Sequence, residues 1–294
     1  MIIDTHVWVT KAEHWGDWNT EVPMDDSMIH AGWNDIGKKT GVIGVSPEKM
    51  LERMDEAGVD KIVLHCMDTP QYGTTIPNEY IAENVRNSNG RFIGLGSFDL
   101  LGGPKSIKKI EKAKDELDLV GFKIFPHRFS VRPNDERLFP LYQRVQELDM
   151  IMFIHTGWSG YPWMLKYQDA SDIDEVAIRF PEMKTVIVHA GDAKFREVLM
   201  MLLKNENLYA NTGWWSFLHP LSMNVELLKL AKHYRVLKRL LWGTDNYDLT
   251  KDVPFVKSLP EKSAELNLFP DLPELDDKDI KMFMGENIAE ILDL

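Results

Sequence analysis

The chain begins with the stretch MIIDTHVW, residues 1–8, in which an apolar start leads directly into Asp-x-His. The apolar residues predict a short buried strand. Because side chains alternate between the two faces of a strand, Asp4, His6 and Trp8 are expected on the same side. A lone Asp-x-His recurs by chance, so this stretch defines no site by itself. It predicts a first strand that delivers a carboxylate, an imidazole and an indole to one face.

Seven further strand-like runs follow, with helix-like segments between them, and this alternation is typical of the α/β class. Several runs are apolar on both faces, as in parallel strands that helices cover. The predicted fold is a (β/α)8 TIM barrel in which residues 1–294 form one domain. The expected later strands are residues 61–66, 91–97, 119–126, 150–155, 185–189, 208–212 and 240–245.

The segments outside this repeat predict a long insertion after strand 1, residues 9–45, and C-terminal helices beyond residue 245. An insertion of this length is either a lid that contacts substrate or a surface loop without chemistry. Ser46-Pro47-Glu48 predicts the start of the first helix, and Gly58 predicts its end. The alternative fold is an open doubly wound sheet, but no convincing Gly-rich phosphate loop follows an early strand.

The composition narrows the classes of protein. No run approaches the roughly 18 apolar residues of a membrane span, and the N-terminus has neither a basic region nor a long apolar segment. The single cysteine, Cys66, excludes an internal disulfide framework and predicts a reducing, cytoplasmic location. The net charge of -12 argues against nucleic acid as a partner. A small anionic substrate stays compatible, because a metal can reverse the local field inside a pocket.

Polar side chains end most of the expected strands, and barrel enzymes build their active sites at these ends. For His65 we keep the alternative of a hydrogen-bonded core histidine. His155 and His189 each end a largely apolar run and precede a small residue and a turn, which favours a functional role. The alternative for Asp245 is a helix N-cap. The strand-end residues are His6, His65, Lys123, His155, His189 and Asp245.

Imidazole and carboxylate groups together suit a divalent transition metal. Three protein ligands and a water leave one position open for catalysis. Such a metal polarises a substrate oxygen, or lowers the pKa of a bound water to about 7. The sequence therefore predicts one divalent metal ion, and both zinc and manganese accept this type of ligand.

Four motifs and a C-terminal segment resemble the amidohydrolase superfamily, in particular the branch of aminocarboxymuconate semialdehyde decarboxylase, γ-resorcylate decarboxylase and related lactone hydrolases. The resemblance covers nearly the whole chain and implies a barrel with one divalent metal. It implies His6, His155 and Asp245 as metal ligands, and His189 as an acid/base or substrate-polarising residue. The motifs are Asp4-x-His6, Ile-His155-Thr-Gly, Val-His189-Ala-Gly, Trp-Gly-Thr-Asp245 and Gly285-Glu286-Asn287.

The sequence departs from the superfamily at Trp8. Most members read Asp-x-His-x-His with two ligating histidines, and an indole cannot ligate a metal. In resorcylate-type decarboxylases the acid before the first histidine binds the metal instead. The resemblance thereby extends the expected ligand set to Asp4, although Asp is shorter than the Glu of those enzymes. The alternative is that metal binding is weaker or lost.

The resemblance gives Lys123 three readings: a carboxylated bridge between two metals, a cation that holds a substrate carboxylate, or a buried structural ion pair. Trp8 argues against two metals, so we favour the substrate cation. Aromatic side chains after the strands suit a flat substrate, or else they pack loops or a subunit interface. The predicted substrate-binding residues are Trp8, His65, Lys123, His127, Arg128, Trp158 and Trp214.

The leading hypothesis is a metal-dependent, non-oxidative decarboxylase of a small aromatic or unsaturated carboxylic acid. His189 and Asp245 are its expected catalytic residues. The alternative is a metal-dependent hydrolase of a lactone, ester or amide, in which Asp245 acts as the base. A third hypothesis, which Trp8 motivates, is a metal-free binding protein. We expect a small-molecule carboxylate as the binding partner and a homo-oligomeric assembly.

Overall fold

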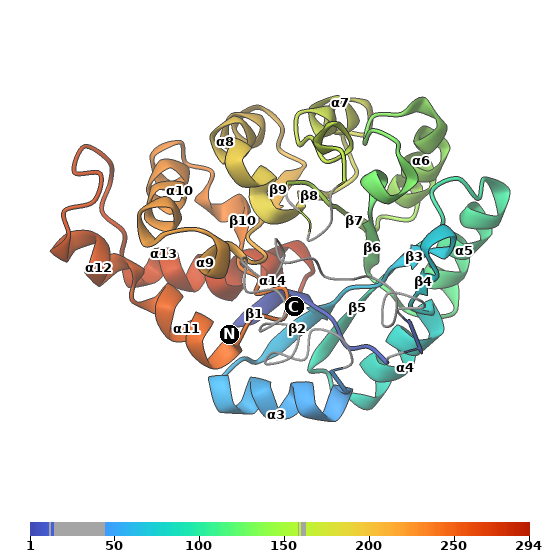
Figure 1. The fold of residues 1–294 in the computed structure, drawn as a ribbon, viewed down its shortest axis with the longest axis horizontal. Helices are drawn as coiled ribbons and strands as arrows, with labels where there is room; N and C mark the ends of the chain where they lie inside the picture. The colour runs from blue at the N-terminus through green and yellow to red at the C-terminus, as the bar shows by residue number, and fades with distance from the viewer. Residues whose placement is uncertain (12, 15–44, 158, 160–162) are drawn as a thin grey trace.

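The computed structural model describes residues 1–11, 13–14, 45–157, 159 and 163–294. Eight parallel strands form one sheet in the order β1-β2-β5-β6-β7-β8-β9-β10, and helices surround it as an outer ring (Figure 1). Most of the expected insertion after strand 1 lies outside the described residues. The strands are β1 (Ile3–Val7), β2 (Lys61–Leu64), β5 (Phe92–Gly96), β6 (Gly121–Ile124), β7 (Ile151–Ile154), β8 (Thr185–Ile187), β9 (Leu208–Asn211) and β10 (Leu240–Leu241).

Hydrogen bonds join the first strand to the end of the last one, so the sheet closes. The Thr5 N–H donates to the carbonyl of Trp242 at 3.0 Å, and the Asp245 N–H donates to the carbonyl of His6 at 2.8 Å. The Thr5 hydroxyl also donates to the Trp242 carbonyl at 2.6 Å. The prediction of a barrel is therefore confirmed, and the open sheet is not formed.

Helices follow the strands along the chain, as the repeat requires. The first one begins as predicted, because the Ser46 hydroxyl accepts from the Lys49 N–H and Pro47 opens the helix. It ends at Gly58, whose φ of 68° is left-handed. The helices are α3 (Pro47–Ala57), α4 (Asn78–Asn87), α5 (Pro104–Asp115), α6 (Phe139–Glu147), α7 (Asp172–Arg179), α8 (Phe195–Lys204), α9 (Trp215–Leu218), α10 (Leu221–His233), α11 (Leu249–Lys257), α12 (Leu259–Glu265), α13 (Asp277–Lys281) and α14 (Asn287–Ile291).

All seven later strands are shorter than predicted, and one pair of strands was not predicted. The eighth strand ends at Leu241 rather than 245, because the Trp242 N–H turns away to the Phe283 carbonyl and Asp245 has a φ of 54°. A short antiparallel hairpin, β3 (Asp68–Thr69) and β4 (Thr74–Thr75), was not predicted. Strands of two residues are too short to produce an apolar alternation in the sequence.

The core has two parts. The larger cluster fills the space between the strands and the surrounding helices. The smaller cluster lies on the opposite face of the strands and includes Val63 and Phe153, together with Ile288 and Ile291 of α14. Parity along a strand places the residue two positions further on the same face. His65 and His155 therefore stand above this smaller cluster.

The C-terminal segment closes the barrel beneath that smaller cluster. A π-helix, η8 (Met282–Glu286), leads into α14. A Cβ at Gly285 would lie 2.2 Å from the Met1 carbonyl oxygen, so only glycine allows this approach. The Asn287 amide donates to the carbonyls of Leu237 and Leu240 at 2.9 and 2.8 Å. In the described part of the chain, no helix combines the length and apolar character that a membrane crossing requires.

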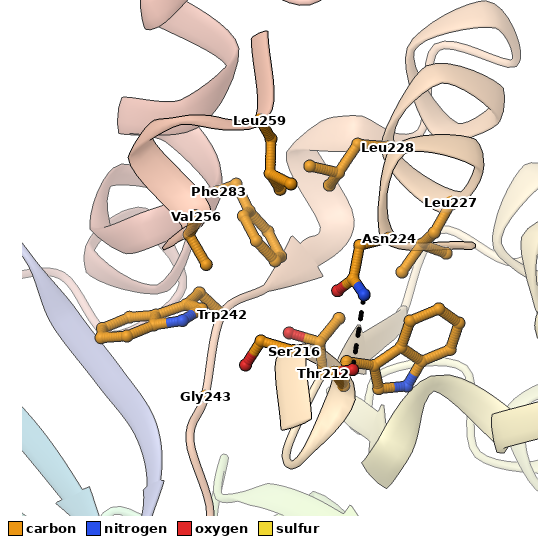
Figure 2. A pocket seen from close by; sticks show the side chains of 11 residues that line it. Thr212, Ser216, Asn224, Leu227, Leu228, Trp242, Gly243, Val256, Leu259 and Phe283 are labelled. Atoms are coloured by element: carbon orange, nitrogen blue, oxygen red, sulfur yellow. Dashed lines mark hydrogen bonds between the residues drawn. The ribbon is translucent and has the colours of Figure 1, made fainter. Parts of the chain in front are cut away.

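A small cavity lies beside β10, between α9, α10, α11 and α12 (Figure 2). Its wall is mostly apolar, and the Asn224 amide at its edge donates to the Trp215 carbonyl at 3.4 Å. Next to it, Asp252 is buried and accepts hydrogen bonds from the Trp242 indole at 2.7 Å and from the Ser216 hydroxyl. Burial raises the pKa of Asp252 to about 7, although the Trp242 hydrogen bond opposes the shift. We interpret this region as packing, not as a binding site.

Replacing Asn287 with Ala should destabilise the barrel. The substitution leaves two buried carbonyls without donors, which costs about 1–3 kcal/mol per unsatisfied group. Urea unfolding measures the loss. Glu286→Ala, an exposed neighbour, serves as the control and should change the unfolding free energy by less than about 0.5 kcal/mol. Equal midpoints for the two variants would contradict the role of Asn287.

Asp252 should make the protein less stable as the pH rises through the interval between its unfolded pKa and its folded pKa. Its folded pKa, about 7, lies above the ordinary aspartate value of 3.8, so the folded state binds more protons in this interval. Asp252→Asn removes this titration. Between pH 5 and pH 8, wild type should lose on the order of 2 kcal/mol more unfolding free energy than the variant. Parallel pH profiles would show that Asp252 is ionised at low cost.

Candidate active site

Six of the predicted strand-end residues come together at the C-terminal ends of the strands. The rings of His6 and His65 stack at 4.0 Å between centroids, and the His6 and His189 rings lie 5.3 Å apart. The His155 ring lies 4.9 Å from the His189 ring. Lys123 on β6 is fully buried among them. The barrel therefore gathers imidazoles, one amine and one carboxylate from six strands and the loops that follow them.

His6, His189 and Asp245 form a group that could hold a metal, because one ligand atom from each lies within 4.8 Å of the others. Within the described ranges, no other set of three such side chains meets this criterion. The His6 Nε2 and the Asp245 Oδ1 are 3.3 Å apart. The donor set of two imidazoles and a carboxylate fits a divalent transition metal.

His6 is neutral and free to bind. Burial, followed by the charges of His65 and Lys123, holds its pKa well below the usual range. Neither ring nitrogen has a hydrogen-bond partner among the described residues. The Nδ1 atom lies against Gly213, where an added Cβ would come within 2.4 Å of it. The Nε2 atom faces Asp245. Because both ring nitrogens are buried without hydrogen-bond partners among the described residues, His6 is consistent with a ligand position.

His189 sits in a strained turn, η6 (Val188–Lys194), with a φ of 62°. Its Nδ1 is 2.9 Å from the Gly213 carbonyl, which can only accept, so Nδ1 carries the proton. The Trp215 indole donates to the His189 carbonyl at 2.7 Å. Burial is the main cause that lowers the pKa of His189, to about 4. Its Nε2 therefore keeps a lone pair for a metal or a proton.

Asp245 is fixed at its backbone and at its side chain. Its carbonyl accepts from the Trp214 indole at 2.6 Å, and its Oδ1 accepts from the Trp8 indole at 2.6 Å. Burial raises the pKa of Asp245 to about 6, while Lys123 and the Trp8 hydrogen bond act in the opposite direction. Trp8 and Trp214, both predicted to bind substrate, contact Asp245, and their role toward the substrate stays a prediction.

Lys123 has no structural ion pair in the part of the chain that is described. Its Nζ is buried without a hydrogen-bond partner there and lies 5.1 Å from the centroid of the Phe125 ring. Burial lowers the pKa of Lys123 to about 7, and the charge of Asp245 opposes this shift. A buried amine without a counter-ion within 4.0 Å is suited to an incoming anion.

Asp4 ties the first strand to the last. Its carboxylate accepts from the N–H groups of His6 and Thr244, at 2.9 and 3.0 Å, and from the Thr244 hydroxyl. Burial raises the pKa of Asp4 to about 7, against the effect of these hydrogen bonds. Asp4 is not part of the three-residue group, and its predicted role as a metal ligand stays a prediction.

His155 and His65 lie beside the three-residue group. The His155 Nε2 is buried without a hydrogen-bond partner among the described residues, and its predicted role as a ligand is likewise untested. The His65 Nε2 lies 2.8 Å from the Thr5 carbonyl, so it carries the proton. The His65 ring supports His6 by stacking, which fits a positioning role as well as the predicted contact with substrate.

The residues after β6 that were predicted to bind an anion lie next to the unpredicted hairpin. His127 lies on η3 (Pro126–Phe129), with its ring 4.4 Å from that of His155. The Gln71 amide donates to the Arg128 carbonyl at 3.0 Å. Tyr72 packs against Trp163, with their ring centroids 5.0 Å apart. Tyr72 follows a two-residue strand and carried no signal in the sequence. Trp158 lies outside the described residues.

The chain has curated relatives of two kinds. It is 23% identical to a dihydroorotase from Helicobacter pylori over 184 residues, which are 60% of this chain and 51% of that protein. It is 32% identical to a 2-amino-3-carboxymuconate-6-semialdehyde decarboxylase from Dictyostelium discoideum over 92 residues, 31% of this chain and 24% of that protein. The chain thus spans at most about half the length of these relatives.

Solved structures share the fold along the whole chain. A 5-carboxyvanillate decarboxylase from Sphingomonas paucimobilis has a TM-score of 0.70 and 16% identity, with 100% of this chain and 99% of that chain covered. A dihydroxybenzoic acid decarboxylase from a Polaromonas species, solved with manganese and 2-nitroresorcinol, has a TM-score of 0.69 and 15% identity, with 100% and 97% covered. The amidohydrolase family profile matches residues 3–294. This chain belongs to the amidohydrolase family.

Proposed function

We propose that this protein is a metal-dependent, non-oxidative decarboxylase of a small aromatic or unsaturated carboxylic acid. The observation that carries the proposal is Lys123, a buried amine with no hydrogen-bond partner among the described residues, beside His6, His189 and Asp245. A substrate carboxylate supplies the missing counter-ion. The decarboxylases that share the fold, and the relative that decarboxylates an unsaturated acid, support this choice of reaction.

One divalent metal, zinc or manganese, is the cofactor in this proposal. His6 and Asp245 belong both to the ligand set that the sequence predicts and to the group that the geometry brings together. The adjacent imidazoles of His189 and His155 offer the next nitrogen, and Asp4 is the further predicted ligand. When bound, the metal would polarise substrate oxygens. The solved decarboxylase that contains manganese supports manganese as the first ion to test.

The residues of the chain then divide the remaining work. Lys123 holds the substrate carboxylate by charge. His189 commits its Nδ1 proton to the Gly213 carbonyl, so we assign proton delivery to the Asp245 carboxyl group. The proton adds to the carbon that bears the carboxylate, and the bond between that carbon and the carboxylate breaks. Its electron pair stays with the substrate, and CO2 leaves without an oxidant or reductant.

Hydrolysis of a lactone, ester or amide is the second candidate function. The dihydroorotase relatives, which match 56–68% of this chain, favour it. The same side chains would serve, with Asp245 accepting a proton from the attacking water. Oxygen-18 water separates the two reactions, because hydrolysis places label in the product acid and decarboxylation does not.

We further propose that the protein is cytoplasmic and works as a homo-oligomer on small carboxylates. Light scattering coupled to size-exclusion chromatography measures the mass of the assembly. The third hypothesis, a metal-free binding protein, predicts less than about a tenth of an equivalent of metal in protein prepared without a chelator.

Protein loaded with one equivalent of manganese or zinc should release CO2 from at least one acid in a panel of hydroxybenzoates and unsaturated dicarboxylates. Removing the metal with a chelator should stop the release, and adding the metal back should restore it, because the metal polarises the substrate. CO2 is quantified by gas chromatography. A loaded protein that releases no CO2 from any acid of the panel contradicts the proposal.

Lys123→Met should weaken binding of the carboxylate substrate while the fold is kept, because a buried amine is costly and Met is apolar. Loss of a charge-assisted hydrogen bond of about 1.5–3 kcal/mol corresponds to a KM about 10–100-fold higher. A phenol that lacks the carboxylate is the matched ligand. Its inhibition constant should stay within about threefold of wild type, and an equal loss for both ligands would show that Lys123 does not recognise the carboxylate.

A further inference from the structure

The Trp8 indole reaches across the barrel closure to Asp245. Its Nε1–H donates to the Asp245 Oδ1 at 2.6 Å, and the side chain is only 6% exposed. The ring packs edge-on against His65 at 5.6 Å and lies 5.9 Å from the His6 ring. A buried indole donor on a carboxylate is a strong, directional contact, because one partner carries a charge.

The main chain of Trp8 is also held, and by the residue that follows Asp245. The Trp8 N–H donates to the Asn246 Oδ1 at 2.7 Å, and the Asn246 amide donates to the Trp8 carbonyl at 2.9 Å. Asp245 and Asn246 both have left-handed backbones, with φ of 54° and 63°. Three hydrogen bonds therefore fix the indole and the loop relative to each other.

These contacts make the two oxygens of the Asp245 carboxylate different from each other. Oδ1 accepts from the indole and lies 3.3 Å from the His6 Nε2. Oδ2 has no hydrogen bond to any residue in the described part of the chain, and the side chain is 18% exposed. The second indole, that of Trp214, donates to the Asp245 carbonyl rather than to its carboxylate. Trp8 is thus the hydrogen-bond donor to this carboxylate among the described residues.

We propose that Trp8 is a positioning residue that anchors Oδ1 of Asp245 beside the His6 Nε2 and so fixes the orientation in which the carboxylate meets a divalent cation. The inference rests on the proposed metal centre, but not on the reaction that takes place there. Orientation of a ligand by a hydrogen-bonding neighbour typically changes metal affinity by about 10–100-fold when it is lost. A purely packing role for the indole predicts an effect on stability alone.

The test is the binding of Mn²⁺ alone to the full chain, measured by electron paramagnetic resonance of the free ion. Trp8→Phe keeps an aromatic ring and removes the donor, and its dissociation constant should rise about 10–100-fold. Trp242→Phe is the matched control, because it deletes an indole donor to another buried carboxylate, that of Asp252. Its dissociation constant should stay within about threefold of wild type.

Urea unfolding of each variant separates folding from binding. If Trp8→Phe does not fold, Asn246→Gly provides the second variant, since glycine accepts the left-handed backbone and removes both hydrogen bonds to the Trp8 main chain. It should also weaken Mn²⁺ binding without unfolding the protein. Unchanged Mn²⁺ affinity in a folded variant overturns the role of Trp8.

Further outcomes separate this inference from the proposed reaction. Wild type that binds Mn²⁺ but releases no CO2 contradicts the decarboxylase alone, and the effect of Trp8→Phe on affinity still decides the inference. Wild type that binds no Mn²⁺ overturns this inference together with the proposed metal centre. An equal loss of affinity in Trp8→Phe and Trp242→Phe overturns the inference too, because it reports a general effect of removing a buried indole.

Discussion

The buried carboxylate of Asp4 is the contact on which the arrangement of the site depends. It accepts two hydrogen bonds from Thr244 and one from the His6 N–H, and so it connects the first strand to the loop after the last one. His6 lies two residues after Asp4 on the first strand, and Asp245 directly follows Thr244 on the loop. Burial raises the pKa of Asp4 to about 7, and the three hydrogen-bond donors compensate for part of the cost of burying its carboxylate. The same hydrogen bonds therefore close the barrel and set the distance between His6 and Asp245.

The loops that follow the strands adopt unfavourable backbone conformations in this geometry. His189, Trp214, Asp245 and Asn246 all have positive φ without being glycine, and all lie at or next to the three-residue group. Each such residue costs of order 1–3 kcal/mol unless its surroundings hold it. The Trp215 indole on the His189 carbonyl and the Trp214 indole on the Asp245 carbonyl are holding contacts of this kind. The tryptophans after the strands thus act on the backbone of the site.

The sequence was sufficient for the barrel because each strand is an apolar run, and the positions of His6, His155 and His189 at the ends of such runs follow from the same pattern. It could not show which of these imidazoles share a point in space. His189 joins His6 and Asp245 from a turn with a left-handed backbone, and the sequence predicts the turn but not its handedness. The contacts of Trp8 with Asp245 and Asn246 span more than 230 residues, so they too depend on the closed barrel.

The charges at the site are compatible with the anionic substrate that we propose for this acidic protein. The net charge of the chain is -12, yet the site combines neutral imidazoles and the buried amine of Lys123 with the carboxylate of Asp245. Because the pKa of Lys123 is lowered to about 7 by burial, its amine is charged at small cost once an anion arrives. An incoming carboxylate and the ammonium state of Lys123 stabilise each other. A neutral lactone has no charge that could stabilise the ammonium group in this way. Recognition of an acid by this amine therefore supports the proposed carboxylate substrate, whichever bond of that substrate is broken.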